Sequence, residues 1–313
     1  MAMPLFSPLD RMLFLKAQPY LTGQPPAVLI ALASYSEECF CPAGSVVRPA
    51  GAAVETVLFL AEGRVEVKPI AGSNRSSRFV EAPGVIGLAH HFSQWNESPE
   101  IRAETDTLCL QVASADLDQI LEDHFTLLLG FGTRSAGEAE RSLRALGAAR
   151  PVEVGYADDK SDFTPAQLDI VERLAQARRA AFFSRTSLSI VGRLIREDQI
   201  EILSHGESLW NAGDPISRMA FIVDGSLVSE GGPYSRTAPP GAVLGTREIL
   251  SEGVHAEGWR AESTVRLLSV PREAFIDALE DHFDYALEYL RYCACDTLKA
   301  WDALADLKGR SSS

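Results

Sequence analysis

Positive charge is in short supply in this sequence. Its 313 residues include 43 acidic side chains against 29 lysines and arginines, which gives a formal net charge of −14. The longest contiguous basic run is the pair Arg178-Arg179. An acidic surface repels the phosphates of nucleic acids and of anionic membranes. We therefore expect no DNA or RNA partner and no electrostatic attachment to a membrane.

Long apolar runs are also lacking. No uninterrupted apolar segment approaches the length of about 18 residues that a membrane-spanning helix needs. The beginning of the chain lacks the basic start and the continuous apolar core of a secretory signal, because Asp10 and Arg11 interrupt it. We therefore expect a cytoplasmic protein. Hydrophobic residues at 46% and charged residues at 23% are ordinary proportions and exclude disorder as the main state.

Cysteine is scarce, and its spacing is wrong for a zinc site. The five cysteines are Cys39, Cys41, Cys109, Cys293 and Cys295. Neither close pair has the C-x-x-C spacing of zinc ligands. The adjacent His90 and His91 would point to opposite faces of a strand, so at most one faces a barrel interior. We predict no metal site and interpret the cysteines as small apolar core residues, with a metal or redox site as the alternative.

Signatures of common catalytic sites are missing too. The sequence contains no nucleophile elbow, no phosphate-binding P-loop and no dinucleotide-binding glycine fingerprint. We therefore predict no catalytic residues and no enzymatic activity.

The chain does contain an internal repeat. Glycines 44, 51 and 63 recur with identical spacing as glycines 206, 213 and 225. Two short words, Arg-Ala-Glu at 102–104 and Glu-Asp-His-Phe at 122–125, recur at 260–262 and 280–283. Such matches in the same order are hard to obtain by chance, so we infer a tandem duplication in which both copies share one fold.

Each copy reads as helices followed by short strands. In the first copy, helices are expected over 7–18 and 26–34, and strands over 45–48, 56–61, 64–68 and 107–112. The strands alternate apolar and polar residues and are separated by glycine turns. Ser114 is expected to cap a following helix. The pattern predicts the α+β class, with a small antiparallel barrel or sandwich flanked by helices.

The repeat sets the expected domain boundaries. We predict a first domain over residues 1–147, a linker over 148–164 that is rich in Gly, Pro and charge, and a second domain over 165–313. A capping box at 164–167 should begin a helix that runs to about residue 182.

The second domain ends in a predicted amphipathic helix. Its apolar positions, three or four residues apart, are Phe283, Leu287, Leu290, Ala294, Leu298, Trp301 and Leu304. Two interpretations of this stripe remain open. A second chain covers it in a homodimer, or the other copy covers it in a pseudo-dimeric monomer.

The repeated words resemble those of a known family. The first copy carries P-A-G-S-V at 42–46, L-F-L-A-E-G-R-V at 58–65 and P-G-V-I-G at 83–87. The second carries A-G-D-P-I at 212–216 and P-P-G-A-V-L-G at 239–245. This set resembles the cyclic nucleotide-binding domain, found in tandem in the regulatory subunit of protein kinase A and singly in the catabolite activator protein. The resemblance implies two tandem β-rolls, each flanked by helices.

The same resemblance implies where a ligand would bind. Family members that bind cyclic nucleotides use a glutamate after a glycine for the ribose hydroxyl and a later arginine for the cyclic phosphate. Leu88 and Thr246 stand at the glutamate position, and Glu97 and His255 at the arginine position. The candidate ligand-binding residues are Gly87, Leu88, Ala89, Glu97 and Ser98 in the first copy and Gly245, Thr246, Arg247 and His255 in the second.

Both charged anchors are therefore missing from both copies. We predict a non-catalytic regulatory or scaffold protein that acts through a protein partner, without a cyclic nucleotide as cofactor. The alternative is a second-messenger receptor that binds a cyclic mono- or dinucleotide atypically, chiefly through the second copy. There Thr246, Arg247 or a charged His255 could meet an anion.

Overall fold

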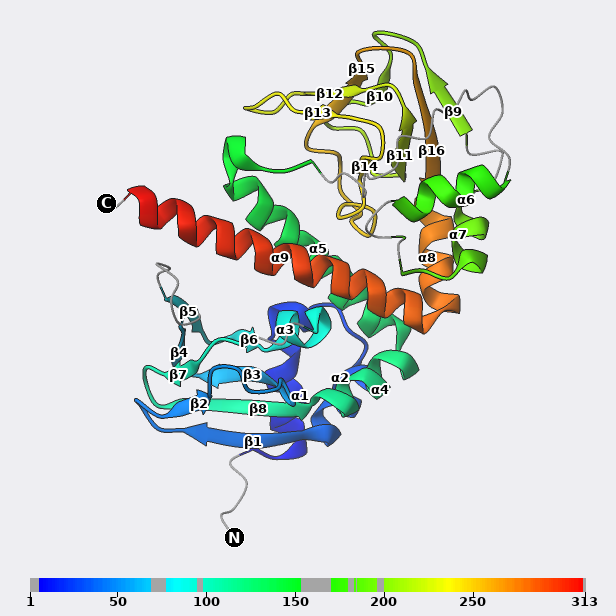
Figure 1. Ribbon diagram of the computed structural model, residues 1–313. Helices are drawn as coiled ribbons and strands as arrows, with labels where there is room; N and C mark the ends of the chain where they lie inside the picture. The colour runs from blue at the N-terminus through cyan, green and yellow to red at the C-terminus, as the bar shows by residue number, and fades with distance from the viewer. Residues whose placement is uncertain are drawn as a thin grey trace. The chain divides into compact units, whose positions relative to one another are not determined.

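The computed structural model divides the chain into two compact units. It describes residues 6–68, 77–94, 98–152, 170–179, 183, 185–195 and 200–311. One unit consists of Met1–Ser142 together with Leu290–Ser313, and the other of Leu143–Tyr289. Each unit holds one of the two sequence copies (Figure 1).

Two antiparallel four-stranded sheets form the first unit's β-roll. The first sheet has the order β1 (Ser36–Cys41), β8 (Thr107–Ala113), β3 (Thr56–Glu62), β6 (Gly84–Ile86). The second has the order β2 (Val46–Arg48), β7 (Ile101–Ala103), β4 (Arg64–Val67), β5 (Arg78–Glu81). Inward-facing apolar residues of both sheets, among them Leu58, Val65 and Ile101, form one buried cluster. Burial of this cluster holds the sheets together.

Helices precede, interrupt and follow these strands. They are α1 (Pro8–Lys16), the 3-10 turn η1 (Pro19–Leu21), α2 (Pro26–Tyr35), α3 (Leu88–Ser93), α4 (Ser114–Asp123), α5 (Phe125–Ala145) and the 3-10 turn η2 (Gly147–Ala149). The expected helices and strands of the first copy are all present, with ends shifted by at most two residues. Ser114 differs from expectation. It is the first residue of α4 rather than its cap, and its hydroxyl donates instead to the Val54 carbonyl 2.8 Å away.

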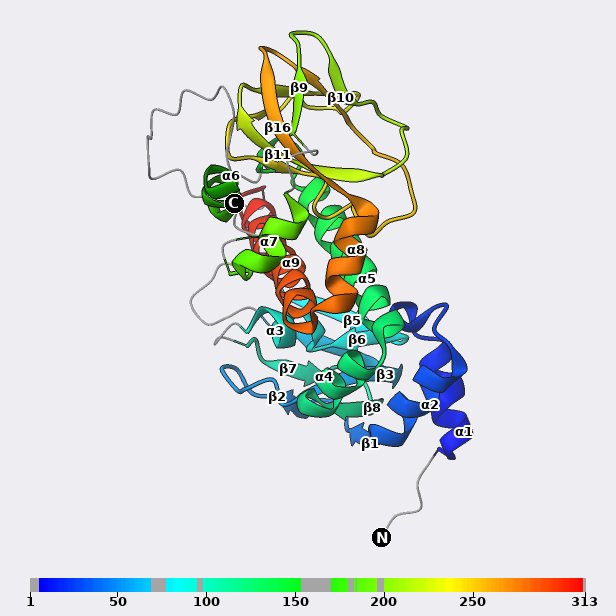
Figure 2. The same ribbon diagram turned by 90° about the vertical axis from the view of Figure 1, so that its right-hand side faces the viewer.

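The second unit repeats the same topology. Its sheets have the orders β9 (Ile200–Leu203), β16 (Val265–Pro271), β11 (Arg218–Asp224), β14 (Val243–Leu244) and β10 (Ser208–Trp210), β15 (Gly258–Ala261), β12 (Leu227–Glu230), β13 (Thr237–Ala238). The helices of the second copy are α6 (Ile170–Arg179), α7 (Leu188–Leu194), α8 (Arg272–Asp281) and α9 (Phe283–Ser311), and α9 lies in the second unit only as far as Tyr289. Figure 2 shows β9, β16 and β11 running side by side. The predicted α+β class with two β-rolls is thus confirmed.

Two of the repeated glycines recur because the turn between two strands requires glycine at that position. Gly63 and Gly225 turn the chain between β3 and β4 and between β11 and β12, with φ of +90° and +80°. A Cβ at Gly63 would collide with the Asp106 backbone, and one at Gly225 with the Thr264 backbone. Only glycine has both the space and the conformational freedom at this turn.

The expected domain boundaries differ from those of the compact units. The first unit ends at Ser142 rather than at residue 147, and α9 from Leu290 onward belongs to the first unit rather than to the second copy. Most of the expected linker, and the capping box at 164–167, lie outside the described residues. Of the helix expected from there to residue 182, the structure describes Ile170–Arg179.

The apolar stripe of α9 explains this division. Leu290, Ala294 and Leu298 are buried within the chain. Farther along α9, the Trp301 ring lies 3.8 Å from the Arg78 guanidinium of β5. Part of the stripe is therefore already covered in a single chain, because folding buries apolar surface wherever the chain offers a matching face.

None of the five cysteines, all of them described, forms a disulfide. Cys39 and Cys41 have their Sγ atoms 3.7 Å apart. Burial raises the pKa of Cys109 to about 12, and burial together with Cys39 raises that of Cys41 to about 11. These two thiols stay protonated near neutral pH, as expected of core residues. In the described part of the chain, no His, Cys, Asp and Glu side chains gather in a group of three or more suited to a metal.

No helix among the described residues has the length and apolar character to cross a membrane.

Candidate functional site

We call the candidate ligand-binding residues of each copy its cassette, and the first-copy cassette begins at a glycine with a left-handed backbone. Gly87, with φ of +94°, connects β6 to α3. A Cβ at this position would lie 3.1 Å from the Thr56 carbonyl oxygen and 3.2 Å from Arg48 Nη1. Leu88, at the family's glutamate position, is buried, and Ala89 is half-buried. Neither side chain can accept a hydrogen bond from a ribose hydroxyl.

Arg48 brings a buried cation to this turn, and sequence reasoning missed it. It is the last residue of β2, and its Nη2 donates to the Thr56 carbonyl oxygen 2.6 Å away. Burial lowers the pKa of its guanidinium, which remains charged. Alternation along β2 turns Arg48 inward, and its counterpart in the second copy is Trp210. A comparison of the inward-facing strand positions of the two copies, in addition to their short repeated words, would have identified Arg48.

His90 adds no second charge at neutral pH. Burial, together with the positive charges of Arg78 and Arg48, lowers its pKa to about 4. The imidazole is therefore neutral in the folded protein near pH 7.

The second-copy cassette starts in the same way but forms no α-helix. Gly245 has φ of +85°, and a turn follows it. Thr246 is 1% exposed, and its Oγ1 has no hydrogen-bond partner among the described residues. Its carbonyl accepts a 3.0 Å hydrogen bond from the Tyr289 hydroxyl of α9. Arg247 is half-buried. The hydrogen bond from Tyr289 therefore anchors this turn to the first part of α9.

His255 is enclosed by other side chains of the protein. It is 1% exposed, and its Nδ1 lies 2.8 Å from a Glu248 carboxylate oxygen. Its ring stacks on Trp210 with centroids 4.1 Å apart and planes inclined by 4°. Glu248 also accepts from Arg144 Nη2 at 3.2 Å. The position at which the family carries its phosphate-binding arginine is therefore occupied by a buried imidazole already bonded to a carboxylate.

The backbone makes Ser98, rather than Glu97, the first-copy equivalent of His255. Gly51 donates to the Ser98 carbonyl at 2.8 Å, and the matching Gly213 donates to the His255 carbonyl at 2.8 Å. The Ser98 hydroxyl is itself bonded to the Ala52 carbonyl at 2.5 Å. Glu97 lies outside the described residues. Counting back from the repeated Arg-Ala-Glu word misses this one-residue difference, because the loops before β7 and β15 differ in length.

Comparison with known proteins finds a family match in the second copy. Residues 200–282 match the family described as the cyclic nucleotide-binding domain, as the sequence resemblance predicted. A comparison with curated protein sequences gives no match.

Several solved structures are similar to the chain at low identity. One is the regulatory domain of Toxoplasma gondii protein kinase A with cAMP, with 12% identity, a TM-score of 0.34, and coverage of 88% of this chain and 95% of that one. Another is the regulatory subunit of a cAMP-independent protein kinase A from Trypanosoma brucei, with 12% identity, a TM-score of 0.34, and coverage of 93% and 90%. A third is the N-terminal domain of a transcriptional regulator from Streptomyces coelicolor, with 19% identity, a TM-score of 0.35, and coverage of 40% and 92%.

Proposed function

We propose that this protein is a non-catalytic regulatory or scaffold protein whose cyclic nucleotide-binding-type domains have exchanged ligand binding for internal contacts. The supporting observation is the second cassette, where Glu248 bonds to both His255 and Arg144. The protein then acts through surfaces presented to a protein partner, and its ligand positions serve the stability of the fold.

The chemistry of a cyclic phosphate supports this proposal. Burying its negative charge requires an arginine and several N–H donors. In the second copy the nearest carboxylate, Glu248, would repel the phosphate, and Thr246 is too short to replace a glutamate. Losing a buried charge-assisted pair costs on the order of 2–5 kcal/mol, which is roughly 30- to several-thousand-fold in affinity. A micromolar site would become negligible.

Calorimetric titration of the full chain with cAMP and with cGMP tests the proposal. We expect no saturable binding with a Kd below about 100 μM for either nucleotide. Low-micromolar binding of either one would refute the loss of ligand binding.

A pair of variants tests whether Glu248 blocks the site. Thr246→Glu with His255→Arg restores both family anchors but leaves Glu248 to neutralise the new guanidinium. Adding Glu248→Ala removes that competing carboxylate. We expect the triple variant to bind cAMP at least about tenfold more tightly than the double variant. Equal affinities would mean that Glu248 does not obstruct the ligand position.

A second candidate function is a receptor for a small anion through the first copy. The sequence favoured the second copy for this role, but the buried Arg48 beside Gly87 favours the first. If the wild-type chain binds a cyclic nucleotide, Arg48→Gln should abolish binding and Arg247→Gln should leave it unchanged. The opposite result would place the anion-binding site in the second copy.

A further inference from the structure

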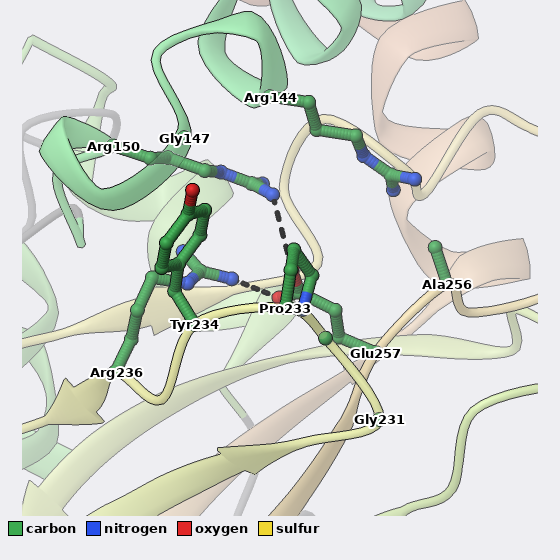
Figure 3. Close-up of a pocket in the computed structure, with 10 residues that line it drawn as sticks. Arg144, Gly147, Arg150, Gly231, Pro233, Tyr234, Arg236, Ala256 and Glu257 are labelled. Carbon is green, nitrogen blue, oxygen red and sulfur yellow. Dashed lines mark hydrogen bonds and ion pairs between the residues drawn. The ribbon is translucent and has the colours of Figure 1, made fainter.

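The second unit contains an arginine-lined pocket whose charges have partners within the protein. Its Glu257 bonds to Arg236, and Arg150 Nη1 lies 3.6 Å from the same carboxylate, as Figure 3 shows. Arg144, which also lines the pocket, bonds to Glu248. The charged groups of this pocket therefore stabilise the fold. The first unit offers a different arrangement, in which two thiols lie in contact with each other.

Cys39 and Cys41 place these two thiols on the inner face of strand β1. Their Sγ atoms lie 3.7 Å apart. Side chains of a strand alternate between its faces, and the intervening Phe40 is 58% exposed on the other face. Cys39 is half-buried and packs against the apolar cluster of the first β-roll, and Cys41 is buried. The spacing C-x-C on a strand thus brings two sulfur atoms together.

The separation of the two sulfur atoms fits a bridge of one atom better than a disulfide. In a disulfide the sulfur atoms are about 2.05 Å apart, and the Cα atoms at most about 6.8 Å apart. Residues two apart on a strand have Cα atoms about 6.6 Å apart, which is close to that limit. A bridging atom with bonds of about 2.3 Å, the length of a zinc–sulfur bond, spans 3.7 Å at an angle of about 107°. A pyramidal, three-coordinate atom has bond angles close to this value or slightly below it.

The surroundings of the pair favour a ligand that leaves no charge behind. Burial and the neighbouring Cys39 raise the pKa of Cys41 to about 11, so its thiol is protonated near neutral pH. A monovalent metal ion held by two thiolates would leave a negative charge beside the apolar cluster, and a structural zinc ion needs four ligands. A trivalent arsenical with one organic substituent needs two sulfur atoms, and its complex is neutral.

We propose that Cys39 and Cys41 form a dithiol binding site for a monosubstituted, trivalent arsenical. Both S–H bonds and the arsenic–oxygen bonds break, two arsenic–sulfur bonds form, and the oxygen leaves with the two protons as one water molecule. Arsenic stays trivalent, so the reaction needs no oxidant or reductant. Soft sulfur ligands bind soft centres of this kind. The half-buried Cys39 gives the ligand access, and Cys41 completes the chelate. The inference does not depend on whether the cassettes bind nucleotides.

Phenylarsine oxide is the probe that tests this site. The reduced full chain receives one equivalent, and a maleimide then labels the remaining thiols after unfolding in urea. We expect peptide mass spectrometry to find Cys39 and Cys41 unlabelled. Cys293 and Cys295 are the matched internal control, because they have the same spacing but lie on α9, where residues two apart point about 200° apart around the helix. Protection of this second pair instead would refute the site.

Competition with other thiols distinguishes binding through two sulfur atoms from binding through one. An excess of glutathione, which offers one thiol, should leave the adduct intact. The dithiol 2,3-dimercaptopropanol should remove it, because it offers an equivalent chelate. An adduct that glutathione removes is held by a single thiol and would contradict the proposal.

Variants assign the two ligands. Cys39→Ala and Cys41→Ala should each abolish the adduct that resists glutathione. Cys109→Ala is the contrasting variant, because Cys109 lies opposite Cys39 in the register of β1 and β8 and is also buried. It should keep the adduct. An adduct that survives Cys41→Ala and is lost with Cys109→Ala would show that the wrong pair has been assigned.

Thermal unfolding tests whether the folded chain holds the pair ready for the ligand. Phenylarsine oxide should raise the Tm of the wild-type chain by at least about 2 °C and leave that of Cys41→Ala unchanged. If the thiols had to leave strand β1 in order to bind, the ligand would favour the unfolded chain. An unchanged or lowered Tm of the wild type would therefore overturn the proposal.

Discussion

The imidazole Nδ1 of His255 lies 2.8 Å from a carboxylate oxygen of Glu248. Both residues belong to the second unit, and the imidazole is 1% exposed. We expect a contact between a buried imidazole and a carboxylate to contribute to the stability of this unit.

Glu248→Ala should therefore lower the stability of the second unit. The substitution leaves the His255 N–H buried without its acceptor and removes one contact of Arg144. We expect a loss of about 1–3 kcal/mol in the free energy of unfolding, measured by urea denaturation. Glu252→Ala, at an exposed position nearby, should change it by less than about 0.5 kcal/mol. Equal effects would show that the Glu248 contacts contribute nothing.

Stability of the first unit should fall as the solution becomes acidic, in part because of His90. Its folded-state pKa is about 4, against an ordinary value of 6.5. The unfolded chain therefore takes up a proton below pH 6.5, whereas the folded chain stays neutral until near pH 4. The stabilisation is complete above pH 6.5 and is lost as the pH falls toward 4, with a slope of at most about 1.4 kcal/mol per pH unit.

The comparison of His90→Gln with the wild type isolates this contribution. Urea denaturation between pH 4 and 7 should give a flatter stability profile for His90→Gln. His124→Gln, a histidine away from α3, should keep the wild-type profile. Parallel profiles for His90→Gln and the wild type would show that His90 titrates normally.

Thr246→Val should stabilise the second unit. The Thr246 hydroxyl is buried without a hydrogen-bond partner among the residues that the structure describes, and valine keeps the shape while removing that cost. We expect a gain of up to about 1 kcal/mol, measured as a rise in the denaturation midpoint. Thr107→Val is the contrasting variant, since the buried Thr107 hydroxyl donates to the Thr105 carbonyl at 2.9 Å and its loss should destabilise. A destabilised Thr246→Val variant would mean that the hydroxyl has a partner.

The full chain should be a monomer in solution. Leu290, Ala294 and Leu298 of the α9 stripe are buried within one chain, so they are not available to a second copy. Light scattering at several concentrations should give a mass near 34.0 kDa. A constant value of twice that mass would favour the homodimer instead.

The repeated glycines and the strand alternation predict the double β-roll, since each depends on local geometry. A tight turn between two strands needs glycine wherever the backbone adopts a positive φ, and alternation marks a half-buried strand. The absence of glutamate at Leu88 and Thr246 is likewise visible in the sequence, because both follow a glycine that the repeat identifies.

The sequence by itself determined the internal repeat, the fold class and which residue types stand at the positions that the resemblance points to. Tertiary structure alone decided which contacts those positions make. Arg48 reaches Gly87 from a distant strand, Glu248 meets His255 across a loop, and Arg150 meets Glu257 across about a hundred residues. Such contacts depend on how strands and loops pack in three dimensions. Two backbone hydrogen bonds, from Gly51 to the Ser98 carbonyl and from Gly213 to the His255 carbonyl, show that a one-residue difference in loop length changes which residues are equivalent in the two copies.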